Sequence, residues 1–308
     1  MTPVPRHLAI IGAPSSAGAY APGQEKTPKA LRDAGLHDRL AQAGVTVDDH
    51  GDGPPRRWRP DPGNRFAQNL STVVDVASAT AEAVRAAAAA GSVVLVLGGD
   101  CTVGLGTVAG HLPADEPVGL IYFDIHADLN TPASVRDGAL DWMGVAHMLG
   151  EPQATPELSR FGPRYPLLNP EHLLLFAVGA AQTTEWERDV IQRRAVVTIP
   201  VEQVAADPDA AAVRALQHMR PRCSRILVHF DVDTIDFTDA PLSENTGRNS
   251  GLTVDAAFRA LTVLLADETV HALTITELNP DHGADDGSTL TDFVERLARA
   301  FSGSLPPS

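Results

Sequence analysis

The sequence is poor in cysteine, in basic residues, in aromatic residues and in long apolar runs. Cys101 and Cys223 are the only cysteines among 308 residues, which excludes a small secreted fold held by disulfides and favours a reducing compartment. Lys and Arg number 24 against 39 Asp and Glu, so the formal net charge is −15. This excess repels nucleic-acid phosphates and anionic lipids, and we expect neither as a partner. It is compatible with metal cations and with a cationic small substrate.

Hydrophobic runs are short throughout. None approaches the roughly 20 residues that a membrane-spanning helix needs. In the N-terminal segment MTPVPRHLAIIGAP the apolar run covers only residues 8–11, which is too short for a signal peptide. We therefore expect a cytoplasmic protein without a membrane segment.

Apolar runs alternate with helix-like stretches along the chain. The runs are almost continuously apolar, which is typical of strands covered on both faces. We predict strands at 7–12, 93–97, 118–123, 173–178, 226–230 and 270–275. We predict helices at 27–43, 70–90, 185–194, 210–219, 253–266 and 288–301. This alternation favours one α/β domain over residues 1–308 with a mainly parallel sheet.

Two segments interrupt the alternation and are predicted to be surface loops, residues 51–64 and residues 150–170. The first has the sequence GDGPPRRWRPDPGN. Its Arg56, Arg57 and Arg59 could clamp an anion, but a solvated loop is the better interpretation of a segment so rich in Pro and Gly.

Ionisable side chains follow two of the predicted strands. Asp124, His126 and Asp128 come directly after strand 118–123. Residues two apart on an extended chain point to one face, so we expect the three to converge. Asp231 and Asp233 follow a second strand with the same spacing. A single such pair is usually a cap or a solvated turn, whereas two clusters in one α/β chain favour a common site.

A third group, Gly98-Gly99-Asp100-Cys101, follows strand 93–97. Its glycines permit a tight turn and close backbone approach. Ligands of open α/β sheets bind beyond the carboxyl ends of the strands, where these groups gather. Carboxylates so close repel one another unless cations lie between them. Such mixed sites favour Mn²⁺, with iron, cobalt or nickel as alternatives, and a metal pair supplies an activated water nucleophile.

These motifs resemble those of the ureohydrolase family, the arginases, agmatinases and their relatives. The family's GGDH, DAHxD and SxDxDxxD blocks and its late glutamate correspond to GGDC at 98–101, DIHAD at 124–128, HFDVDTID at 229–236 and ITELNP at 275–280. The segments IGAPSSAG and LRDAGL near the N-terminus are also similar. The resemblance covers roughly residues 7–300. It implies a three-layer αβα, arginase-like fold, two Mn²⁺ ions and hydrolysis of a small guanidino substrate, by a monomer or a homo-oligomer.

The resemblance implies roles for the matching residues. The metal ligands would be Cys101, Asp124, His126, Asp128, Asp231 and Asp233. Asp128 would also move a proton, Glu277 would pair with the guanidinium group, and Asp141 is a further catalytic candidate. The candidates for substrate binding are Asn130, Asp137, Glu187 and Thr246.

Several positions depart from the family pattern. Cys101 stands where the family has a histidine ligand; a thiolate is a competent ligand, and the alternative is a packed thiol. Asp141 stands where arginases have a histidine that is thought to shuttle protons. His229 replaces a serine, either as a core histidine or as a base near the site. The first two departures resemble the N-omega-hydroxy-L-arginine amidinohydrolases, arginase-like enzymes of D-cycloserine (antibiotic) biosynthesis.

Three alternative functions stay open. The chain could be an arginase, an agmatinase or another guanidino-acid hydrolase. It could be a non-catalytic protein on a ureohydrolase scaffold, although the retained acidic clusters argue against that. It could be a cysteine hydrolase with Cys101 as nucleophile, but no histidine is spaced in the sequence as its partner base.

Overall fold

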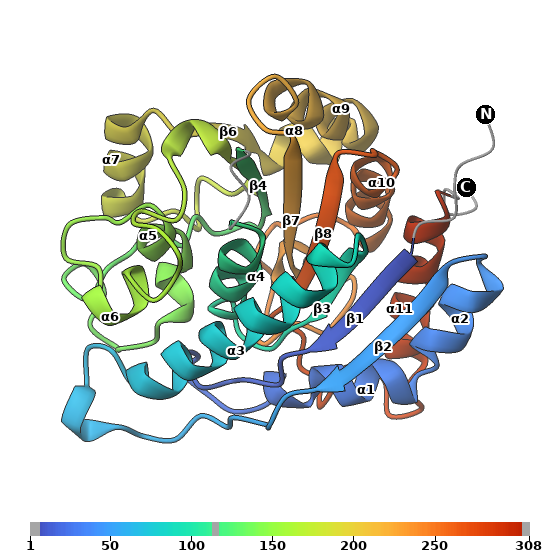
Figure 1. Cartoon of the computed structure of the whole chain (residues 1–308), viewed down its shortest axis with the longest axis horizontal. Coiled ribbons are helices and arrows are strands. Elements are labelled where there is room, and N and C mark those ends of the chain that lie inside the picture. The colour runs from blue at the N-terminus through green and yellow to red at the C-terminus, as the bar shows by residue number, and fades with distance from the viewer. Residues whose placement is uncertain (1–6, 113–116, 304–308) are drawn as a thin grey trace.

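The computed structural model describes residues 7–112 and 117–303, and these form one eight-stranded sheet (Figure 1). Its strands are β1 (His7–Gly12), β2 (Thr46–Asp52), β3 (Val93–Leu97), β4 (Val118–Phe123), β5 (Leu173–Val178), β6 (Val197–Pro200), β7 (Arg225–Asp231) and β8 (Val270–Thr276). Their spatial order is β2-β1-β3-β8-β7-β4-β5-β6, and every pairing within the described residues is parallel. The predicted α/β class is confirmed.

Helices cover both faces of the sheet. Those on one face are α3 (Leu70–Ala89), α4 (Val103–His111), α5 (Gly144–Met148), α6 (Pro156–Ser159) and α7 (Glu185–Arg194). Those on the other are α1 (Thr27–Asp33), α2 (Leu36–Gln42), α8 (Val201–Ala206), α9 (Pro208–Met219), α10 (Val254–Leu265) and α11 (Ser288–Ser302). Because side chains alternate along a strand, β3 sends Val94 and Val96 into the first apolar layer and Leu95 and Leu97 into the second. The predicted three layers are therefore present.

The six predicted strands are all present, but two edge strands were missed. Strand β2 has the sequence TVDDHGD and is largely exposed, so it lacks the apolar run on which the prediction depends. Strand β6 is only four residues long. Edge strands tolerate polar residues because they have only one neighbouring strand and need not be completely buried.

The single helix predicted over 27–43 is wrong. Gly35 adopts a φ of +86°, a left-handed conformation, and separates α1 from α2. Helix α4 was not predicted, since its sequence VGLGTVAGH is glycine-rich and buried all round, without an amphipathic period. The predicted loop 150–170 contains the short helix α6.

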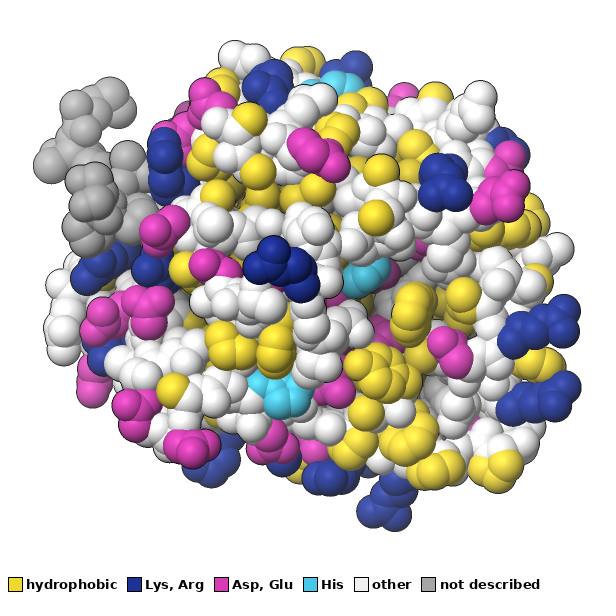
Figure 2. All heavy atoms as spheres, turned by 180° about the vertical axis from the view of Figure 1, so that it is seen from behind, with side chains coloured by type: hydrophobic (Ala, Val, Ile, Leu, Met, Phe, Trp, Pro, Cys, Tyr) yellow, Lys and Arg dark blue, Asp and Glu magenta, His cyan; other side chains and the backbone are white. Residues whose placement is uncertain are grey.

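The surface has no strong segregation of charge on the face drawn in Figure 2. Acidic and basic side chains are interspersed there, and acidic side chains also lie in a hollow near the middle of this face. In the predicted loop 51–64, Arg57 contacts the carboxylate of Glu25 at 3.2 Å. Within the residues described, no helix combines the length and the apolar character that crossing a membrane requires.

Candidate functional site

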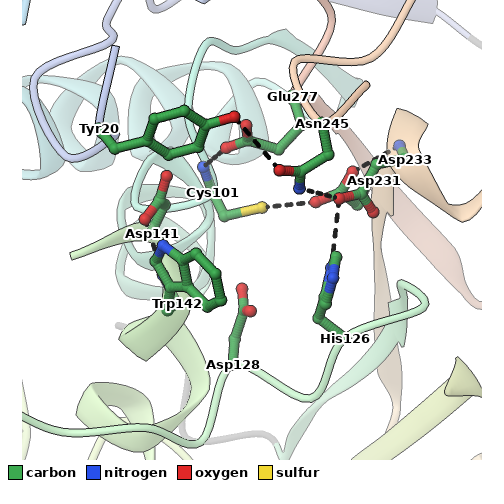
Figure 3. A pocket seen from close by; sticks show the side chains of 10 residues that line it. All are labelled: Tyr20, Cys101, His126, Asp128, Asp141, Trp142, Asp231, Asp233, Asn245 and Glu277. Carbon is green, nitrogen blue, oxygen red and sulfur yellow. Dashed lines mark hydrogen bonds and ion pairs between the residues drawn. The ribbon is translucent and has the colours of Figure 1, made fainter. Parts of the chain in front are cut away.

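A pocket lies at the carboxyl ends of β3, β8, β7 and β4, four consecutive strands of the sheet. The space within it, counted together with its open mouth, is about 330 Å³. The side chains that line it converge from several loops (Figure 3): Tyr20, Cys101, His126, Asp128, Asp141, Trp142, Asp231, Asp233, Asn245 and Glu277.

Cys101 follows β3 after the predicted tight turn. A Cβ atom on Gly99 would lie 1.7 Å from the carbonyl oxygen of Ser15, so the close backbone approach there requires glycine. The Cys101 thiol donates to Asp231 Oδ2 at 2.9 Å. Burial raises the pKa of this thiol well above its ordinary value, and the charges of Asp231 and Glu277 add to the effect.

The residues after β4 come together, but not on an extended chain as predicted. The His126 amide donates to Asp124 Oδ1 at 2.7 Å, which closes a turn, and Asp128 has a φ of +49°. These turns leave the Asp124 and His126 side chains 3.4 Å apart. Asp128 accepts a hydrogen bond from the buried Tyr122 hydroxyl. Convergence therefore comes from local turns that the two-residue spacing did not indicate.

The residues after β7 also converge through a turn. A short 3₁₀ helix (Val232–Thr234) begins directly after Asp231. The Asp233 amide donates to Asp231 Oδ1 at 2.7 Å, which turns Asp233 toward His126, whose Nδ1 lies 3.2 Å from Asp233 Oδ2. The same Asp233 oxygen accepts from Asn245 Nδ2 at 2.7 Å. Asn245 was not among the predicted residues.

The side chains gathered in the pocket fit a pair of cations. The potential ligand atoms of Asp124, His126 and Asp233 lie within 4.8 Å of one another, and so do those of Cys101, Asp124 and Asp128. Asp124 belongs to both groups, so two neighbouring ions could share it. Asp124 Oδ2 and Asp233 Oδ1 are buried without any hydrogen-bond partner, a cost that a bound cation would remove.

The pKa values of the buried acids also favour bound cations at this site. Burial raises the pKa of Asp124 to about 6, and the charge of Asp233 contributes. Burial also raises the pKa of Asp128 and of Asp231 well above the usual range, with repulsion from neighbouring carboxylates second. Cations between these groups would stabilise their ionised forms.

Glu277 follows β8 and lies in the pocket. Its backbone adopts a left-handed φ of +58°. Oε1 accepts from the Cys101 amide at 2.8 Å and Oε2 accepts from Gln24 Nε2 at 2.9 Å. Burial, followed by the charge of Asp100, raises the pKa of Glu277 well above its usual range. The carboxylate is thus held in a fixed orientation.

The mouth of the pocket carries Asp141 and two aromatic residues. Asp141 is buried, and burial followed by the charge of Glu277 raises its pKa well above the usual range. Trp142 lies next to it, with its ring centroid 6.3 Å from that of His126. Tyr20 donates its hydroxyl to Asn245 Oδ1 at 3.3 Å. Neither aromatic residue was predicted from the sequence, because both lie outside the motifs. The one available signal for Trp142 was its position next to Asp141.

Four predicted substrate-binding residues lie outside the pocket lining. Thr246 and Asp137 are exposed, and Asp137 caps its own loop by accepting from the Ala139 amide. Glu187 is buried, where it completes the capping box of α7 with Thr184. Asn130 is also buried and accepts from Ser134 Oγ at 3.0 Å. Their proposed contacts with a substrate stay predictions.

His229 lies beneath the pocket against Cys101. Its Nε2 is 3.4 Å from Cys101 Sγ, a contact across 128 residues that spacing in the sequence did not indicate. Burial lowers the pKa of His229 to about 3, which leaves the ring neutral. The raised pKa of the buried thiol argues against a nucleophilic cysteine, because the thiolate is the reactive form.

A model of the arginase family matches residues 6–300, nearly the whole chain. The chain belongs to the arginase family. Members of this family are metal-dependent hydrolases that act on guanidino carbon–nitrogen bonds, and they use a dinuclear metal centre, typically of Mn²⁺.

The individual relatives that this arginase-family chain matches include several arginases. It is 28% identical over 277 residues to an arginase of Bacillus caldovelox, which covers 89% of this chain and 91% of the relative. It is 30% identical over 287 residues to an arginase of Glaciozyma antarctica, a match that covers 91% of this chain and 82% of the relative. The solved structure of the Bacillus caldovelox arginase superposes with a TM-score of 0.83 at 26% identity, covering 96% of this chain and 98% of that one.

Proposed function

We propose that this chain is a dinuclear metal hydrolase whose preferred substrate is N-omega-hydroxy-L-arginine, which it cleaves to hydroxyurea and ornithine. The observation that carries the choice of substrate is the pair of departures in one pocket. Cys101 and Asp141 both line it, at the positions where the resemblance gives histidines. A hydroxylated guanidine is less basic than that of arginine, so its neutral form is more accessible.

The proposed metal ligands are the six residues described above. The two ions would be held by Cys101, Asp124, His126, Asp128, Asp231 and Asp233. Mn²⁺ is the proposed metal, with iron, cobalt or nickel as alternatives. When bound, two divalent cations polarise the reacting groups and lower the pKa of water toward neutrality.

The guanidino group would be oriented by Glu277. Its carboxylate is already held by the Cys101 amide and by Gln24, so little freedom is lost when substrate N–H groups donate to it. Charge-assisted bonds of this kind are short and directional. Tyr20 and Trp142 would flank the flat group at the mouth of the pocket.

Two carboxylates would move protons. Asp128 would accept a proton from the attacking water, with the Tyr122 hydroxyl fixing its orientation. Asp141 would deliver a proton to the leaving nitrogen, since a raised pKa lets a buried carboxyl group hold a proton near neutral pH.

Arginine is the second candidate substrate, because the curated relatives are named arginases. A substrate panel separates the two. The metal-loaded protein is assayed on hydroxyarginine, arginine and agmatine at equal concentrations, with urea and hydroxyurea quantified separately. A higher kcat/KM for hydroxyarginine supports the proposal, and a higher value for arginine or agmatine contradicts it. No turnover, with less than about one metal per chain, would indicate a non-catalytic protein.

A further inference from the structure

His229 contacts Cys101 but does not itself line the pocket. Its Nε2 lies 3.4 Å from Cys101 Sγ and 3.0 Å from Thr276 Oγ1. The Thr276 hydroxyl is itself 3.4 Å from the same sulfur. The sulfur therefore has two polar neighbours from two adjacent strands, β7 and β8, in addition to Asp231.

The orientation of the His229 ring is fixed by packing. The ring stacks on Tyr122 with centroids 4.2 Å apart and an interplanar angle of 11°. Its other nitrogen, Nδ1, is buried without a hydrogen-bond partner and faces Gly104. A Cβ atom on Gly104 would come within 2.6 Å of Nδ1, so this glycine makes room for the ring. Only the Nε2 edge is directed toward polar atoms.

We propose that His229 is a positioning residue for the Cys101 sulfur, to which its Nε2–H donates a hydrogen bond. The inference rests on the proposed role of Cys101 as a metal ligand and deepens it. Partners of this kind orient a ligand and tune the metal, and losing one typically costs about 10- to 100-fold in metal affinity. A sulfur at this position has lone pairs that a histidine ligand lacks, and His229 and Thr276 are the groups within reach to satisfy them.

The same ring links the sulfur to the proton-accepting carboxylate. Tyr122, on which His229 stacks, donates its hydroxyl to Asp128. One buried aromatic pair thus supports two side chains of the pocket, Cys101 and Asp128. Both the cysteine and this histidine depart from the family pattern, and in the fold they touch.

The test uses the metal-free full-length protein titrated with Co²⁺, because a thiolate ligand gives a charge-transfer absorption band that carboxylates and imidazoles do not. His229→Gln keeps an amide nitrogen at about the reach of Nε2, whereas His229→Asn is one methylene shorter. We expect the Gln variant to bind Co²⁺ within about threefold of the parent, and the Asn variant about 10-fold or more weakly. The Asn variant should also shift the thiolate band to lower energy, since the sulfur loses a hydrogen-bond donor.

A Cys101→His background provides the control. There is no sulfur to orient in it, so Gln and Asn at position 229 should give equal Co²⁺ affinities. Thermal unfolding of the metal-free variants checks that both are folded. Equal affinities and identical bands for the two variants in the Cys101 protein would overturn the inference and leave His229 as a packing residue. If the parent binds Co²⁺ without a thiolate band, Cys101 is not a ligand and the inference falls with that assignment, while the substrate panel still decides the reaction.

Discussion

Glu277→Gln tests the proposed orientation of the substrate. The substitution keeps the shape of the side chain but prevents it from forming the carboxylate to which substrate N–H groups would donate. The remaining oxygen can still accept from the Cys101 amide. The new amide group would face Gln24 Nε2, but Gln24 can turn its own amide over, because its Oε1 has no partner in the structure. We therefore expect the free energy of unfolding to change by only about 1 kcal/mol.

The effect on catalysis should be much larger. A hydrogen bond to an ionised group contributes about 1.5–3 kcal/mol and a neutral one about 0.5–1.5 kcal/mol, so replacing two charge-assisted bonds loses roughly 2–3 kcal/mol. At about 1.4 kcal/mol per tenfold change, kcat/KM should fall roughly 30- to 150-fold. Steady-state kinetics on the metal-loaded protein measures this, and chemical denaturation measures the stability.

Glu244→Gln is the matched control. Glu244 is a second buried glutamate, which accepts from Asn279 Nδ2 at 2.6 Å and does not line the pocket. The same chemical change there should leave kcat/KM within about threefold of the parent. The proposed role of Glu277 is wrong if Glu277→Gln keeps parental kcat/KM, or if the control loses as much.

Other predictions concern the metal site, the pocket mouth and the core. Asp128→Ala or Asp231→Ala should abolish metal-dependent turnover, and full activity in either would contradict the mechanism. Asn245→Ala removes the 2.7 Å hydrogen bond to Asp233 and should weaken Mn²⁺ binding about 10-fold in a metal titration; an unchanged affinity would exclude this role. Tyr20→Phe removes one hydrogen bond at the mouth of the pocket and should raise KM a few-fold with little effect on kcat. A fall in kcat with an unchanged KM would be inconsistent with a binding role. Burial lowers the pKa of His147 to about 4 from 6.5, so the unfolded chain takes up a proton first as the pH falls. The stability this neutral histidine provides is present above pH 6.5 and is lost toward pH 4, by about 2 kcal/mol between pH 7 and pH 5. Urea unfolding of the parent and of His147→Gln should show that the free energy of unfolding of the variant falls less between pH 7 and pH 5. Equal falls in the two proteins would show that His147 is not the group responsible.

The interior of the fold was predictable from sequence, and its edges were not. Continuous apolar runs identify buried parallel strands, which is why the six central strands were found. Strand β2 forms through backbone pairing with β1 and needs no apolar side chains of its own. The break at Gly35 depends on the conformation of one residue, which periodicity does not reveal.

Within the site, the strand-end clusters were predictable, whereas contacts from distant loops were not. The acidic motifs identify residues that topology brings to one sheet edge, including Asp124 and Asp231. Tyr20 and Asn245 reach the pocket from loops 225 residues apart in sequence, and they meet only in three dimensions. The contact between Cys101 and His229 likewise joins the ends of β3 and β7, which are separated in the sheet by β8.

We propose above all that two metal ions in this acidic pocket drive cleavage of N-omega-hydroxy-L-arginine. Titrating metal-free protein with Mn²⁺ while measuring hydroxyurea released from N-omega-hydroxy-L-arginine tests it most directly. We expect no turnover without metal, and a rate that rises until about two ions are bound per chain. Turnover that persists in metal-free protein, or its absence with both ions bound, would contradict it.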